Sequence, residues 1–168
     1  KKLFIRFINI IKKRIELEDK AGINRQITEM RKKLYPATYS LIAANINLKK
    51  SRGGITDIEF AIQSIILKNP DIYKTVVGKN TSKVLSVIAE KKGYSDLNEL
   101  IDNFRFIKNL ALQNQNIFNT LTTVLPQDEK KMEILSLRCG FQSAPELMNR
   151  LQKIMKINQS FFDKYTGD

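Results

Sequence analysis

The residues best placed to do chemistry form a short basic segment that contains two adjacent glycines. Lys49 and Arg52 precede Gly53 and Gly54, and an apolar run of helical type follows them. Glycine allows backbone conformations that other residues avoid, so backbone amides can approach a ligand closely. Positive side chains beside a helix N-terminus are typical of sites that bind phosphate. The segment therefore predicts an anion site, although a tight turn before a buried helix would use the same residues.

The start of the following helix has the spacing of a capping box. The Thr56 hydroxyl would accept a hydrogen bond from the Glu59 amide, and the Glu59 carboxylate would accept one from the Thr56 amide. Asp57, in the same turn, would interact favourably with the helix dipole. Since Asp57 and Glu59 are two residues apart on a helix, they point to different sides and are not expected to share a metal ion. We interpret these three residues as helix-capping residues and predict no metal site.

The same segment resembles a motif of bacterial glutamine synthetase adenylyltransferases. That motif has a basic residue, a spacer, Arg-Gly-Gly-Ile, a variable basic residue, an acid and Ile-Glu-Phe, with a Gln soon after. The residues that match it are Lys49, Arg52, Gly53, Gly54, Ile55, Asp57, Ile58, Glu59, Phe60 and Gln63. Thr56 stands where the family usually has Arg. The related PII uridylyltransferases carry a looser version, and the Ile-Glu-Phe ending favours the adenylyltransferases.

Weaker similarity extends from about Ile23 to Tyr165. Residues 103–110 resemble the family's aromatic-Arg-Phe-Leu segment on a long helix. The family continues that helix with Glu and Arg, where this chain has Ala111 and Gln113. Any ion pair that those family residues make is therefore absent here.

The resemblance implies a parent enzyme that transfers AMP from ATP to a tyrosine of glutamine synthetase and removes it again, under control of a PII protein. Such enzymes need Gly-Ser followed by Asp-x-Asp to hold Mg²⁺ against the nucleotide phosphates. This chain contains neither pattern. We expect a fragment that is inactive alone, whose ATP and Mg²⁺ belong to the parent. Its partners would be the catalytic nucleotidyltransferase domain of that parent, glutamine synthetase and PII, with Lys49, Arg52, Gly53 and Gly54 facing the catalytic cleft.

Composition narrows the functional classes further. The 168 residues include no histidine and one cysteine, Cys139, which excludes imidazole chemistry and an internal disulfide and suits the cytoplasm. The net charge is +12, and residues 1–50 hold 13 of the 29 Lys and Arg but only 4 of the 17 acids. An acidic partner or phosphates would suit this charge, whereas motifs for binding nucleic acid are missing. No apolar run has membrane-spanning length.

Apolar residues recur at helical spacing along nearly the whole chain. We predict an all-α bundle of about five or six helices with a partly irregular basic N-terminal arm. Residues 1–47 would be the end of a nucleotidyltransferase core or connecting helices, and residues 48–168 a helical bundle domain. The predicted breaks are Pro36, Asn69-Pro70, Gly93, Pro126 and Gly140. Two alternatives remain open: a fragment of a PII uridylyltransferase, and a free-standing basic helical binding module.

The apolar pattern also predicts where individual helices lie. Ile23, Ile27, Met30 and Leu34 form one apolar stripe on a helix that Asn24 could cap. The helix from Thr56 to Lys68 is apolar on most of its surface, which is typical of a central helix. Later helices should start at Thr81 or Ser82, at Gln127 or Asp128, and at Ser143, where Glu146 completes a second capping box.

Overall fold

The computed structural model describes residues 2–17, 19–34, 45–91, 94 and 96–167. These residues form helices and connecting turns, with no strand among them, so the all-α prediction is confirmed. The helices within the described ranges are α1 (Lys2–Leu17), α2 (Lys20–Leu34), α3 (Ile55–Lys68), α4 (Pro70–Val76), α5 (Thr81–Ala89), α6 (Leu97–Phe118), α7 (Glu129–Arg138) and α8 (Ala144–Thr166).

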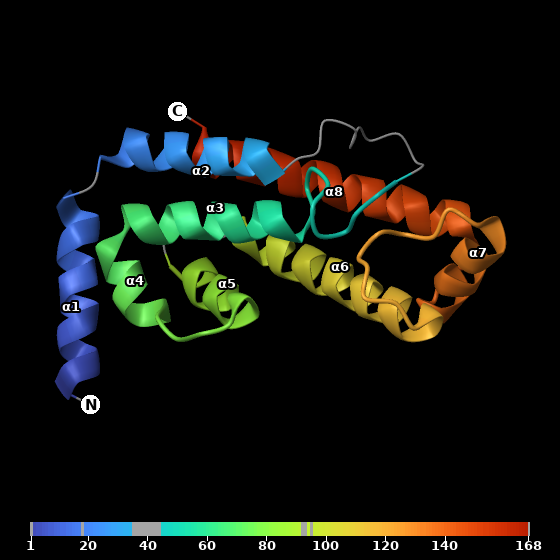
Figure 1. Cartoon of the computed structure of the whole chain (residues 1–168), viewed down its shortest axis with the longest axis horizontal. Coiled ribbons are helices and arrows are strands. Elements are labelled where there is room, and N and C mark those ends of the chain that lie inside the picture. Colours follow the sequence, from blue (N-terminus) through green and yellow to red (C-terminus); the bar gives the residue numbers. More distant parts are fainter. Residues whose placement is uncertain (1, 18, 35–44, 92–93, 95, 168) are drawn as a thin grey trace.

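Helix α3 is the central element of the bundle. It packs between α2 and α8 on one side and α4, α5 and α6 on the other, while α1 crosses one end of the molecule (Figure 1). Within the described part of the chain, α3 contacts every other helix except α7. Its side chains explain this position, because a helix that is apolar nearly all round has no face to give to water. The core residues of α3 include Ile58, Ala61, Ile62 and Ile65.

The N-terminal arm contains two helices within its described residues, and α1 keeps Ile5, Ile10 and Leu17 exposed. Most of the irregular part predicted for this arm lies outside the described residues. Helix α2 begins at Lys20, where the Asp19 carboxylate accepts hydrogen bonds from the next turn's amides, so Asn24 is not its cap. The expected break at Pro36 lies outside the described residues.

Proline explains part of the difference between five or six helices and eight. Pro70 ends α3, as predicted, but it also opens α4, because a proline suits the first turn of a helix. Helix α6 ends at Phe118, because the next residue, Asn119, takes a left-handed conformation. The end therefore lies well before Pro126. Helix α8 is consequently the longest described helix, by one residue over α6. Gly93 lies outside the described residues, and the domain boundary between residues 47 and 48 stays a prediction.

Three helix starts agree with the sequence. Asn80 caps α5, Asp128 caps α7 and Ser143 caps α8, each by accepting a hydrogen bond from an amide three residues on. The box at the start of α8 is only half formed, since the Glu146 carboxylate accepts from the Gln142 amide at 2.7 Å. Short polar side chains followed by an apolar pattern therefore located these starts correctly.

Ile62 offers a test of the central position of α3, because its side chain is 4% exposed. We expect Ile62→Ala to lower the free energy of unfolding by about 2–5 kcal/mol, as large-to-small changes in a core do. Chemical denaturation would measure the loss. Leu121, which is 97% exposed, provides the control, and Leu121→Ala should leave the midpoint nearly unchanged. An unmoved midpoint for Ile62→Ala would contradict the central position of α3.

Candidate functional site

Residues 47–54, which we call the basic turn, lead directly into α3. The Asn47 carbonyl accepts from the Ser51 amide at 2.9 Å, and the Ser51 hydroxyl accepts from the Asn47 amide at 2.9 Å. The Asn47 side-chain carbonyl also accepts from the amides of Lys49 and Lys50, at 3.0 and 2.9 Å. Asn47, which the sequence analysis did not single out, therefore organises the backbone from which the basic side chains extend.

The loop after α6 supports the basic turn from outside. The Leu48 amide donates to the Thr123 carbonyl at 2.9 Å, and the Thr123 hydroxyl donates to the Asn47 side chain at 2.8 Å. Asn47 and Val124 form an isolated antiparallel bridge. A segment some seventy residues away in sequence thus fixes the entry to the turn.

The two glycines are required by close packing. Gly53 has a φ of +75°, and a Cβ added there would lie 1.9 Å from the Met155 carbonyl oxygen of α8. At Gly54 an added Cβ would lie 2.7 Å from the carbonyl oxygen of Leu48. Both glycines are buried, so they bring the basic turn against α8 and against itself.

The amides at the start of α3 are all used within the chain. Gly53 donates to the Asp57 carboxylate, and Gly54 donates to the Ser51 carbonyl. Ile55 donates to the Leu48 carbonyl at 3.0 Å and Thr56 to the Lys49 carbonyl at 3.1 Å. The amides of both glycines are therefore already engaged within the chain.

The predicted capping box at the start of α3 is wrong. The helix begins at Ile55, Gly54 is its N-cap residue, and no side chain caps it there. Thr56 is buried inside the first turn, and Glu59 is half-buried. Asp57 lies in the third helical position, and its carboxylate accepts a hydrogen bond from the Gly53 amide. Asp57 thus reaches back to an amide at the start of the helix, as Glu59 was predicted to do.

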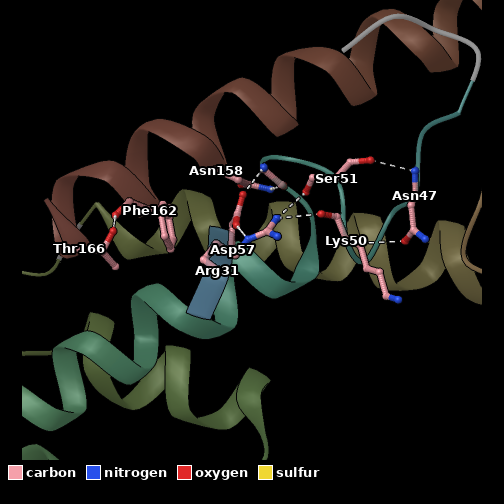
Figure 2. Close-up of polar contacts among 9 residues, drawn as sticks. Arg31, Asn47, Lys50, Ser51, Asp57, Asn158, Phe162 and Thr166 are labelled. Atoms are coloured by element: carbon pink, nitrogen blue, oxygen red, sulfur yellow. Dashed lines mark hydrogen bonds and ion pairs between the residues drawn. The ribbon is translucent and has the colours of Figure 1, made fainter. Parts of the chain in front are cut away.

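Asp57 also forms a buried ion pair with Arg31 of α2. The two side chains are 0% and 1% exposed, and Arg31 Nε donates to the Asp57 carboxylate (Figure 2). Arg31 Nη2 donates to the carbonyls of Lys50 and Ser51, at 2.8 and 3.2 Å. Because burial of a lone charge is costly, each partner needs the other.

The sequence analysis missed Arg31 because the apolar stripe expected on α2 did not include it. Ile23 and Ile27 are buried as expected, but Met30 and Leu34 are 55% and 42% exposed, and Arg31 is buried in their place. Asn158 of α8 was also missed. Its side-chain amide donates to the Gly53 carbonyl at 2.8 Å and accepts from Asn103 at 3.1 Å. A polar residue on an apolar helix face was the available signal in both cases.

Exposed positive charges cover this buried framework. Lys49, Lys50 and Arg52 all have exposed side chains on the turn. Phosphates and carboxylates are the groups that such cations bind. Their proximity to a nucleotide stays a prediction, as does that of the two glycines.

Metal-ligating side chains and the cysteine thiol were the other candidates for chemistry among the described residues. No three Asp, Glu or Cys side chains gather there as metal ligands would, and Asp57 is already held by Arg31 and Gly53. Burial raises the pKa of the half-buried Cys139 thiol, which disfavours the reactive thiolate. No helix in the described ranges is long and apolar enough to cross a membrane.

Gly53 and Gly78 allow the cost of backbone strain to be measured separately from the cost of a steric clash. Gly53 and Gly78 have φ values of +75° and +78°, but nothing lies within 4 Å of a Cβ added at Gly78. We expect Gly78→Ala to cost about 1–2 kcal/mol from the left-handed backbone alone. Gly53→Ala should cost about 1–3 kcal/mol more, because the α8 backbone must move. Thermal or chemical unfolding of both variants would measure this, and equal losses would contradict the close contact with Met155.

Comparison with known proteins agrees with the resemblance of the motif. The family model for GlnD PII-uridylyltransferase matches residues 21–166. Several relatives are bifunctional glutamine synthetase adenylyltransferase/adenylyl-removing enzymes. The one from Rhizobium meliloti is 26% identical over 113 residues, covering 66% of this chain and 11% of the relative. The one from Corynebacterium glutamicum is 32% identical over 117 residues, covering 64% of this chain and 11% of the relative.

The chain thus spans about a tenth of the length of these relatives. The family model, in contrast, accounts for nearly all of the chain, including the whole of the basic turn and the helices that hold it. On this evidence the chain belongs to the GlnD PII-uridylyltransferase family.

Proposed function

We propose that this chain is the helical, non-catalytic portion of a nucleotidyltransferase that regulates glutamine synthetase by transferring AMP to it. The names of the relatives supply the reaction, and their greater length supports a catalytic nucleotidyltransferase domain in the same parent. The cytoplasm, suggested by the single cysteine, and control by a PII protein are parts of the same proposal.

The basic turn is the observation that carries the proposal. Lys49 and Arg52 extend from a backbone that is fixed by buried groups, so they present positive charge at a defined place. They would contact the nucleotide phosphates, or carboxylates, at the catalytic cleft of the parent. The bundle around α3 would act as the rigid scaffold that holds them there.

The ATP and Mg²⁺ of the parent have different relations to this chain. The Asp57 carboxylate does not fit a metal ion, because Arg31 and Gly53 occupy it. Mg²⁺ would therefore bind to carboxylates of the catalytic domain. The exposed Lys49 and Arg52 do fit phosphate groups, so this chain would contribute charge toward ATP and no metal ligand.

A second candidate is transfer of UMP to a PII protein. The family model that covers residues 21–166 is described as a PII-uridylyltransferase, whereas the relatives named above transfer AMP. Incubation of the full-length parent with ATP or UTP, and with glutamine synthetase or PII, would distinguish the two by the mass added to each protein.

The isolated chain should transfer no AMP. Incubation with ATP, Mg²⁺ and glutamine synthetase, followed by mass spectrometry, should show no added AMP above background, because the chain has no Asp-x-Asp to hold the metal ions. Clear transfer would overturn the assignment of a non-catalytic role.

The basic turn can be tested in the full-length parent. We expect Arg52→Ala to slow AMP transfer about tenfold or more, as the loss of one charge-assisted contact implies. Lys49→Ala should act in the same direction. Lys74, which is exposed on α4, provides the control, because α4 follows the end of α3 opposite the turn and Lys74→Ala removes the same charge there. Unchanged rates for both turn variants would reduce the basic turn to a structural element.

A further inference from the structure

Arg31 holds the basic turn at its centre and at its junction with α3. One nitrogen of its guanidinium donates to the carbonyls of Lys50 and Ser51, at 2.8 and 3.2 Å. Its Nε binds the Asp57 carboxylate, which in turn accepts from the Gly53 amide. The residues on both sides of Arg52 are therefore connected to a single side chain of α2 (Figure 2).

We propose that Arg31 is a positioning residue for anion binding by the basic turn. This inference rests on the proposed function, in which Lys49 and Arg52 contact phosphates. Arg31 is 1% exposed and lies against a carboxylate, so its own charge is neutralised and does not reach an outside ligand. It acts instead by fixing the backbone from which the exposed cations extend.

The planar guanidinium is what makes this arrangement possible. It offers donors in a rigid fork, so one side chain reaches a carboxylate in one direction and two carbonyls in another. A lysine ammonium is a point charge and would keep the pairing with Asp57 while losing the geometry. A buried ion pair adds little stability compared with well-packed apolar residues. Its place beneath the basic turn favours a role in defining conformation.

Asn158 completes the attachment from the opposite side. Its amide holds the Gly53 carbonyl at 2.8 Å, while Asp57 holds the Gly53 amide. Gly53 is thus held directly by α3 and α8, and α2 acts on it through the ion pair of Arg31 with Asp57. The position of α2 is thereby coupled to the place at which Arg52 leaves the turn.

The test uses the full chain and inorganic triphosphate, and compares Arg31→Lys with Ile88→Ala. Ile88 is fully buried on α5, so its truncation destabilises the core away from the turn. Calorimetric titration at fixed salt, well below each melting midpoint, would measure affinity, and hydrogen exchange would follow the Gly53 amide. We expect Arg31→Lys to weaken triphosphate binding about tenfold and to speed Gly53 exchange. Ile88→Ala should lower the melting midpoint and change neither property.

A double variant keeps the proposal testable if Arg31→Lys does not fold. Arg31→Met combined with Asp57→Asn removes both charges together, so no unpaired buried charge remains. It should show the same weaker binding and faster exchange.

Native affinity and native Gly53 exchange in the Arg31 variants would overturn the positioning role. Equal weakening by Ile88→Ala would also overturn it, because general stability would then explain the effect. The combination of Lys49→Ala and Arg52→Ala tests the proposed function separately. If that double variant binds triphosphate as the native chain does, or if the native chain does not bind, the proposed function fails. Gly53 exchange would still decide whether Arg31 fixes the turn.

Discussion

The buried start of α3 is the constraint on which the surrounding structure depends. A central helix with a buried N-terminus must satisfy its first amides inside the protein, because water cannot reach them. The carbonyls of Leu48 and Lys49 accept from the first two amides of the helix, and the Asp57 carboxylate accepts from the Gly53 amide just before it. The guanidinium of Arg31 balances the negative charge of that carboxylate. The path of residues 47–54 follows from this requirement, since the chain must fold back over the end of its own helix.

The same requirement separates structural from functional groups within one short motif. The two glycines and Asp57 are buried, and they are engaged by backbone contacts and by the ion pair with Arg31. Lys49 and Arg52 face outward, with positive charge that the fold itself does not bury. The motif that predicted a single anion site therefore has a buried part, Gly53, Gly54 and Asp57, and an exposed basic part, Lys49 and Arg52.

This division is consistent with a scaffold that works beside a catalytic domain. A rigid frame places cations at low conformational cost, and preorganised charge is most effective when it does not need to move during binding. The carboxylates that hold metal ions would come from the other domain. The proposed parent would thus combine chemistry from one part with positioned charge from the other.

The sequence by itself determined the helical class, the central place of α3 and three of the helix starts. These features depend on local periodicity, and on short side chains such as Asp128 and Ser143 that bond amides three residues away. The motif also located the basic turn. It did not show that the glycines meet the backbone of α8, because that contact joins Gly53 to Met155, a hundred residues along the chain.

Tertiary structure alone decided which residues near the end of α2 are buried. The apolar spacing placed Ile23 and Ile27 correctly, but Arg31 takes the inner place that it assigned to Met30 and Leu34, because Asp57 and two turn carbonyls satisfy its guanidinium there. Whether a charged residue lies inside depends on partners that are remote in sequence, and no local pattern contains them. Whether a segment forms a helix depends mainly on its local sequence, whereas the environment of each polar side chain depends on the elements that pack around it.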